Sequence, residues 1–350
     1  MGATTGTAAT DSLGREGQGI IGVAADGTGS LHSFRTDSGI SLPGEGPLEM
    51  AVDIHFPRQL VEPAVMLVCL PGGGTNRRFF DLQPPESQRD GSFSFARHMT
   101  ARGFIVVLVD HLGVGESSRP KDGYALSSDV LSQAADHVHG AIRAQVQAHY
   151  GNAFAHPCSI GVGHSMGAML TVLQQAQHRT HQAIVLLGFS TRGLPEYVPQ
   201  PLHALTRDPV ALRAQLATHA RYMFKEPYPR LQSTAESRTM FAGDRADARG
   251  VAALKVAGDE PLLPVPSFHA MLPGNVTSEA ASIDVPVFLG VGDQDIVGPP
   301  GEVSRAFQRS SAVASYVMPN TGHCHFLFAS RFALFEAIAA WTRLVTQNCA

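Results

Sequence analysis

The chain has 350 residues, of which 44% are hydrophobic and 16% charged, with a net charge of −4. This composition supplies a buried core and excludes a disordered or collagen-like chain. The Lys and Arg residues are scattered, so neither a nucleic acid nor an anionic membrane is expected as a partner, and the oligomeric state stays open.

The start of the chain and its cysteines bear on the compartment. Residues 1–19 lack the basic start and apolar core of a signal peptide, and no run is apolar for long enough to span a bilayer. Four cysteines are too few for a disulfide framework, and Cys69 and Cys158 lie in or beside apolar runs that favour reduced, buried thiols. We therefore expect a cytoplasmic location.

The N-terminal part divides into a tail and a pair of strands. Residues 1–28 are expected to form a flexible extension. Residues 29–56 alternate short extended runs with Gly/Pro turns, which predicts an antiparallel pair of strands.

Buried strands alternate with helices from residue 64 onward. Continuous apolar runs at 64–70 and 104–109 predict strands covered on both faces, with a helix over 94–102 between them. Strands alternating with helices indicate a mostly parallel sheet with helices on both faces. The further predictions are helices over 128–149, 166–177 and 330–346 and strands over 159–163, 183–187, 285–291 and 312–318.

Residues 191–283 interrupt this alternation with short helical pieces and no convincing buried strand. So long a segment is not expected to be a structureless loop inside a compact domain. We predict a helical cap inserted into an α/β core made of residues 29–190 and 284–350. A peripheral helical layer without a functional part is the alternative.

The segment 163–167, Gly-His-Ser-Met-Gly, follows an apolar strand and opens a predicted helix. In that context G-x-S-x-G is the motif of a nucleophile elbow, where a strained turn projects the serine hydroxyl from the sheet edge. Small residues on both sides let strand and helix approach closely, and the helix N-terminus favours negative charge on the attacked oxygen. We predict Ser165 as the nucleophile; a serine that only caps the helix is the alternative.

A serine hydroxyl is a weak nucleophile and needs a base, which an acid in turn orients. His323, in the loop after the last predicted strand, is the candidate base, and His325 competes with it. Asp295 is the candidate acid because it follows the strand over 285–291, with Asp293 as the alternative. A His-x-His metal pair is a weaker interpretation, since no Asp, Glu or Cys cluster completes a site, and we expect no metal or cofactor.

A charged oxygen in the reaction would need preorganised N–H donors. Residues 71–76, Pro-Gly-Gly-Gly-Thr-Asn, follow a buried strand, so their amides can approach a ligand without Cβ hindrance. We predict the amides of Gly73 and Met166 as the oxyanion donors. A phosphate-binding loop is not favoured, because no Gly-Lys-Ser/Thr follows.

Taken together, these motifs resemble the α/β-hydrolase superfamily over about residues 50–346. The resemblance implies an eight-stranded, mostly parallel sheet, an inserted cap after the sixth strand, and a triad of Ser165, Asp295 and His323. The segments that carry it are 70–74 (Leu-Pro-Gly-Gly-Gly), 110–117 (Asp-His-Leu-Gly-Val-Gly-Glu-Ser), 163–167, 292–295 (Gly-Asp-Gln-Asp) and 322–323 (Gly-His).

The expected activity is hydrolysis of a carboxylic ester of an apolar or aromatic small molecule through an acyl-enzyme. Carbon–carbon bond hydrolysis, lactone hydrolysis and amide hydrolysis would use the same triad, and a non-catalytic binder is the alternative of another class. Gly74, His164, Tyr222 and Phe268 are predicted to contact the substrate. Side chains that could wall an apolar pocket, or form the insertion's own core, are Phe189, Tyr197, Tyr222, Met223, Phe224, Phe268 and Met271.

Overall fold

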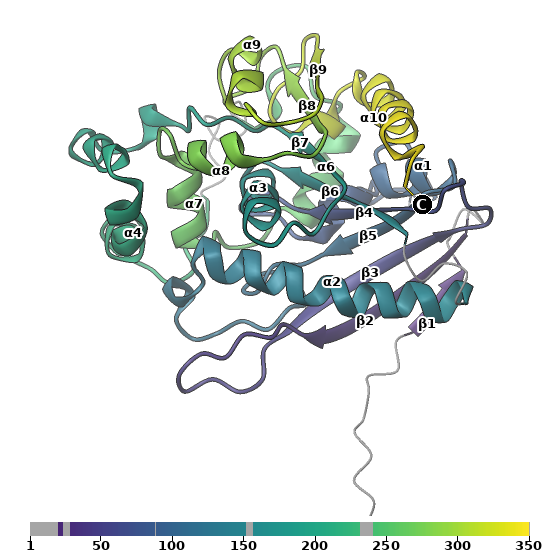
Figure 1. Ribbon diagram of the computed structural model, residues 1–350, viewed down its shortest axis with the longest axis horizontal. Helices are drawn as coiled ribbons and strands as arrows, with labels where there is room; N and C mark the ends of the chain where they lie inside the picture. The colour runs from purple at the N-terminus through teal and green to yellow at the C-terminus, as the bar shows by residue number, and fades with distance from the viewer. Residues whose placement is uncertain (1–19, 24–28, 88, 152–156, 232–240, 350) are drawn as a thin grey trace, which may run out of the picture.

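The computed structural model describes residues 20–23, 29–87, 89–151, 157–231 and 241–349 (Figure 1). Its strands are β1 (Ile20–Val23), β2 (Gly29–Asp37), β3 (Glu49–Pro57), β4 (Val65–Leu70), β5 (Ile105–Val109), β6 (Cys158–His164), β7 (Ala183–Leu187), β8 (Val287–Gly292) and β9 (Val313–Met318). Its α-helices are α1 (Phe95–Thr100), α2 (Ser128–Tyr150), α3 (Met166–His178), α4 (Pro209–Phe224), α6 (Ala248–Ala257), α7 (Pro264–Met271), α8 (Thr277–Ser282), α9 (Pro300–Val303) and α10 (Arg331–Thr346). Short 3₁₀ turns are η1 (Arg77–Asp81), η2 (Gly123–Ala125), η4 (Pro195–Tyr197), η5 (Gln200–Arg207), η6 (Ser304–Ala306) and η7 (His325–Leu327).

All nine strands belong to one sheet in the order β1-β2-β3-β5-β4-β6-β7-β8-β9. The pairs from β5 through β9 are parallel, while β1, β2 and β3 are antiparallel to their neighbours. The predicted fold class is confirmed, and each helix and strand predicted from residue 64 on lies within two residues of its predicted ends. The ninth strand is β1, which falls inside the predicted N-terminal extension; residues 1–19 and 24–28 of that extension lie outside the described part.

Central strands are apolar throughout because helices cover both faces of the sheet. Side chains alternate between faces along a strand. Met66, Val68 and Leu70 therefore join a core under α2 and α3, whereas Val65, Leu67 and Cys69 join one under α1 and α10. Figure 1 shows α2 and α3 in front of the sheet and α10 toward its other side. The uninterrupted apolar runs follow from this two-sided burial.

The described part of the segment between β7 and β8 consists of α-helices, 3₁₀ turns and loops and holds no strand. Helices α4 and α7 stand beside one end of the sheet (Figure 1) and share a small apolar core that includes Leu212, Leu216 and Phe268. This arrangement supports the division into core and cap, whose boundaries at 191 and 283 stay a prediction; residues 232–240 lie outside the described part. Among the described helices, none has the length and apolarity to cross a bilayer.

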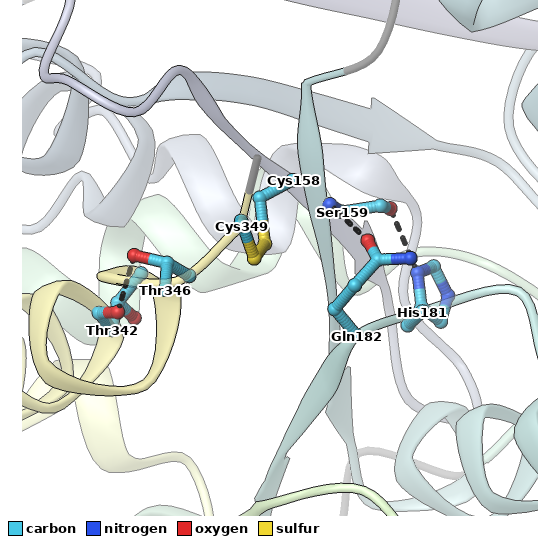
Figure 2. Close-up of a disulfide and its surroundings, with 7 residues drawn as sticks. All are labelled: Cys158, Ser159, His181, Gln182, Thr342, Thr346 and Cys349. Atoms are coloured by element: carbon cyan, nitrogen blue, oxygen red, sulfur yellow. Dashed lines mark hydrogen bonds between the residues drawn. A yellow bond between two sulfur atoms is a disulfide. The ribbon is translucent and has the colours of Figure 1, made fainter.

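The structure corrects one expectation about the cysteines. Cys158, at the start of β6, forms a disulfide with Cys349, which follows α10 (Figure 2). The last turn of α10 is held by the Thr346 hydroxyl, which donates to the carbonyl of Thr342 at 2.8 Å. Cys158 is buried as expected, but the apolar run around it gave no sign of a partner 191 residues away.

Beside the disulfide, two buried histidines share one serine. Ser159 Oγ lies 2.9 Å from His139 Nε2 and 2.9 Å from His181 Nδ1 (the latter contact is drawn in Figure 2). Its single proton allows it to donate to one ring and accept from the other. Burial lowers the pKa of His139 to about 4 and that of His181 well below its ordinary value, so both rings are neutral in the folded chain.

The disulfide should make stability depend on redox conditions. Cross-linking two distant positions restricts the unfolded chain, so Cys349→Ser is expected to lower the free energy of unfolding by about 2–4 kcal/mol. Urea denaturation with and without a thiol reductant measures this. The reductant should destabilise the wild-type chain and leave Cys349→Ser unchanged; equal sensitivity of both proteins would contradict the prediction.

Acid should destabilise the fold through its buried histidines. Burial also lowers the pKa of His111 and of His269 to about 4, whereas a histidine in the unfolded chain titrates near 6.5. Between these values the unfolded state binds more protons, so stability falls as pH falls, by up to about 1.4 kcal/mol per pH unit for each such histidine. Urea midpoints between about pH 7 and pH 4.5 test this, and His139→Gln should weaken the dependence. A midpoint that stays constant over this range would refute it.

Candidate active site

Ser165 occupies the sharp turn between β6 and α3. Its backbone has φ 55° and ψ −121°, a strained conformation for a residue with a side chain. The turn requires glycine on both sides: a Cβ on Gly163 would lie 2.4 Å from Cα of Ala168, and one on Gly167 would lie 2.2 Å from the carbonyl oxygen of Leu70. The two glycines of the motif therefore permit the close approach of β4, β6 and α3 that presents the Ser165 hydroxyl.

The structure brings the three predicted triad residues together from three separate loops. His323 Nε2 lies 2.8 Å from Ser165 Oγ, and His323 Nδ1 lies 2.7 Å from Asp295 Oδ1. With Nδ1–H donating to the carboxylate, Nε2 is free to accept the serine proton. Asp293 points elsewhere: it is exposed, and it accepts the amide of Thr321 at 3.1 Å. Of the two acids the sequence left open, Asp295 is the one in contact with His323.

His325, the competing base of the sequence analysis, contacts the same carboxylate from its other side. Its Nε2 donates to Asp295 Oδ2 at 2.8 Å, and both side chains are fully buried. Burial by itself raises the pKa of Asp295, but the charge of His323 and the hydrogen bonds from both histidines outweigh it and hold this pKa well below its ordinary value. Asp295 is thus an anion fixed between two imidazoles, and His325 does not reach the serine.

Two neighbours fix the position of the His323 ring and its loop. Gly188, the residue after β7, has φ 57°, and a Cβ there would lie 2.9 Å from His323 Cε1, so this position requires glycine. His164 Nε2 donates to the carbonyl of His323 at 3.0 Å. Burial, reinforced by the charges of His323 and His325, lowers the pKa of His164 well below its ordinary value. A neutral His164 therefore holds the loop without adding positive charge next to His323.

The loop of residues 71–76, which follows β4 and contains three glycines, is held by a largely buried ion cluster centred on Arg77. Its amide donates to Asp110 Oδ1 at 2.7 Å, its guanidinium pairs with the same carboxylate, and it reaches Asp53 at 2.6 Å and Glu116 at 2.7 Å. This arginine was not identified from the sequence, because its partners come from β3, the end of β5 and the loop beyond. It ties the loop that carries Gly73 to the sheet.

Beside Ser165 lies an apolar cavity of about 330 Å³. Gly73 and Met166, the two predicted oxyanion residues, line it together with Ser165 and His323. Within the described residues, neither amide donates to another group. The remaining lining residues are Met169, Gly188, Phe189, Ser190, Gly193, Leu194, Tyr197, Met223, Phe224, Leu231, Phe241, Leu262, Ser267, Ala270, Met271, Asn275, Ile296 and Val297.

The four predicted substrate contacts do not line this cavity. Tyr222 is 72% exposed, because it lies on the outer side of α4. Phe268 is fully buried in the core shared by α4 and α7, so its ring packs the cap. His164 is buried behind His323, and Gly74 faces Leu231 and Leu262 rather than the serine. The apolar walls come instead from other members of the predicted set, namely Phe189, Tyr197, Met223, Phe224 and Met271.

The two histidines of the His-x-His segment do not converge on a common point, since each binds a different oxygen of Asp295. Across the described part of the chain, no group of three or more His, Cys, Asp or Glu side chains is arranged to hold a metal ion.

Removing His325 should weaken the site more than replacing it by another donor. His325→Leu leaves Oδ2 of a buried carboxylate without its partner, which is expected to lower the free energy of unfolding by about 1–3 kcal/mol. It should also slow the labelling of Ser165 by an organophosphonate about tenfold or more, because Asp295 is then free to turn away from His323. His325→Gln keeps an N–H donor and should retain most of both properties. Labelling rates followed by mass spectrometry, together with urea denaturation, measure the two effects; a leucine variant indistinguishable from wild type would contradict this role.

Comparisons with known proteins agree with this architecture. The chain is similar to a thermophilic esterase from Thermogutta terrifontis (TM-score 0.52, 18% identity, covering 89% of this chain and 99% of that one). It is also similar to a carboxyl esterase from Bacillus coagulans (TM-score 0.57, 17% identity, 94% and 98%) and to a proline iminopeptidase from Mycobacterium smegmatis (TM-score 0.59, 17% identity, 91% and 100%). At these identities the likeness concerns the fold.

The sequence itself gives the more direct assignment. No curated protein matches the chain significantly. The model of the alpha/beta hydrolase family, however, matches residues 67–334, which include the elbow, the cap and every residue of the proposed triad. The chain belongs to the alpha/beta hydrolase family.

Proposed function

We propose that this hydrolase cleaves carboxylic esters of apolar or aromatic small molecules, with Ser165 as nucleophile, His323 as general base and acid, and Asp295 as the orienting carboxylate. The observation that carries the proposal is the continuous hydrogen-bonded series from Ser165 through His323 to Asp295, with distances of 2.8 and 2.7 Å. A protein that only binds a ligand has no need of this geometry, nor of the strained backbone at Ser165.

The reaction follows from these contacts. Ser165 Oγ attacks the ester carbonyl carbon while its proton moves to His323 Nε2, and the carbonyl electron pair becomes an oxyanion facing the amides of Gly73 and Met166. Collapse of this intermediate breaks the bond to the alcohol oxygen, which takes the proton from His323. Water, deprotonated by His323, then attacks the acyl-enzyme and releases the acid. Asp295 stays ionised and stabilises the imidazolium throughout.

The cavity supports an uncharged, apolar substrate. Its described lining contains no Asp, Glu, Lys or Arg, and most of its wall is aliphatic, aromatic or thioether. An aminopeptidase substrate brings a charged amine, and a carboxylate-bearing substrate brings an anion; desolvating either without a partner would be costly. An apolar ester meets no such penalty. Lactone, amide and carbon–carbon bond cleavage would use the same triad, but no feature of the cavity favours them over ester cleavage.

The compartment does not affect this chemistry. Disulfides persist in oxidising surroundings, so the Cys158–Cys349 bond weighs against the cytoplasmic location that the sequence favours. Both cysteines lie outside the cavity lining, and no thiol takes part in the proposed reaction. The proposal therefore holds for either location.

Ser165→Ala should abolish turnover of p-nitrophenyl esters and the phosphonyl adduct at position 165. Loss of at least about 10⁴-fold in kcat is expected, because the nucleophile is removed. A matched control is Ser282→Ala, which removes an exposed serine of α8 whose Oγ donates to the carbonyl of Glu279 at 2.7 Å and which lies outside the cavity lining. Activity across acyl chain lengths, with mass spectrometry of the adduct, gives both readouts. A wild-type chain that cleaves no ester and leaves Ser165 unlabelled would refute the proposal.

A further inference from the structure

Ser267 places a hydroxyl of the cap at the oxyanion side of the cavity. It lies on α7, is only 7% exposed, and lines the cavity together with Gly73, Met166 and Ser165. Its Oγ would lie 3.5 Å from a Cβ built on Gly73, which places it next to the backbone of one predicted oxyanion donor. The hydroxyl also contacts the side chain of Met166, the residue that supplies the other donor.

This hydroxyl lacks a strong partner. Within the described residues, its one hydrogen bond runs to the thioether sulfur of Met166 at 3.6 Å, and such a sulfur is a weak acceptor. Buried polar groups are normally satisfied by stronger acceptors, because leaving one nearly unpaired costs free energy. Among the other polar side chains of the cavity, Ser190 accepts the amide of Arg192, and Asn275 donates to the carbonyl of Ala270. Besides Ser165, Ser267 is the cavity hydroxyl whose contacts lie with both Gly73 and Met166, so it is the one placed for a ligand at the oxyanion side.

We propose that Ser267 is a third oxyanion donor, which turns its O–H from the Met166 sulfur to the charged oxygen of the tetrahedral intermediate. This inference rests on the proposed function, since it presupposes attack by Ser165. A full negative charge is a far better acceptor than a thioether, whereas the neutral ester carbonyl gains much less from the same donor. Ser267 would thus act mainly in the transition state. It would also make the cap a direct participant in the chemistry.

The test separates the charged intermediate from simple binding. An aryl trifluoromethyl ketone forms a hemiketal: Ser165 Oγ bonds to the carbonyl carbon, its proton moves to His323, and the carbonyl oxygen becomes an oxyanion. The corresponding aryl methyl ketone, which stays largely unreacted, reports ground-state binding. Affinities of both ketones, and kcat and KM for a p-nitrophenyl ester, are measured for wild type, Ser267→Ala, Ser267→Cys and the control Ser282→Ala.

Ser267→Ala is expected to lower kcat and trifluoromethyl ketone affinity by about 10- to 100-fold, with KM and methyl ketone affinity changed less than about twofold. This expected loss of kcat and of ketone affinity is no larger than the loss that follows removal of a single oxyanion donor, because two amides remain to bind the charged oxygen. Ser267→Cys keeps a side chain of similar shape but offers only a weak donor, so it should resemble the alanine variant. Ser282→Ala, which lies outside the cavity, should match wild type in all four quantities.

Three outcomes would overturn the inference alone. If Ser267→Ala binds both ketones as wild type does, the hydroxyl does not meet the oxyanion. If it loses affinity for both equally, or if Ser267→Cys restores full activity, Ser267 contributes shape or ground-state contact instead. A wild-type chain that forms no hemiketal at Ser165 would instead refute the proposed function, and this inference with it. If the variants and the wild type unfold at the same temperature, any loss of activity or affinity arises at the site rather than from a weakened fold.

Discussion

The site depends on one constraint, the left-handed backbone of Ser165 between β6 and α3. A residue with a side chain adopts this conformation only where surrounding structure holds it. Two contacts with neighbouring segments stabilise the conformation of Ser165. Gly167 lies against the carbonyls of Leu70 and Pro71, and the amide of Ser165 donates to the carbonyl of Leu187 at 2.8 Å. Strands β4 and β7 thus clamp the turn from both sides. Because the loop of residues 71–76 follows β4 and Gly188 follows β7, the same two strands position Ser165, the predicted oxyanion donors and the ring of His323.

Charge in this site is arranged around a single anion. Asp295 is buried, and each of its two carboxylate oxygens is bonded to one imidazole, so neither oxygen is left without a hydrogen-bond partner. His164, next in line, is kept neutral by burial and by the charges around it. The result is a series of rings in which only His323 reaches the serine. An ion cluster around Arg77 holds the loop after β4, and none of its residues lines the cavity.

Most of the fold, and the meeting of Ser165, His323 and Asp295, could be predicted because their signals are local. Burial on both faces makes a strand apolar, and the nucleophile elbow needs glycine at fixed spacing. Both patterns can therefore be recognised within a short stretch of the sequence. Asp295 and His323 were also accessible, since each follows a strand of the parallel sheet. What could not be predicted depends on contacts between distant segments. The partner of Cys158 is 191 residues away, Arg77 draws its carboxylates from three segments, and the choice between Tyr222 and Met223 as a cavity residue depends on how α4 is rotated. His325 illustrates the limit: its proximity to His323 suggested competition, but in three dimensions the two residues share one acid.

The helices between β7 and β8 differ in how they pack. Helix α4 and Phe268 of α7 share one apolar cluster, whereas α6 and α8 contribute to the clusters on the two faces of the sheet. The proposed triad stands on loops of the sheet. Substitutions on α4 can therefore reshape the cavity without disturbing the proton-transfer geometry, which is the kind of separation that lets substrate range drift during evolution while the reaction is retained. Helix α7 is where this freedom should narrow, because consecutive residues, Ser267 and Phe268, face the cavity and the cap interior respectively. A lineage that diversifies its substrates is thus expected to vary α4 first and to keep α7.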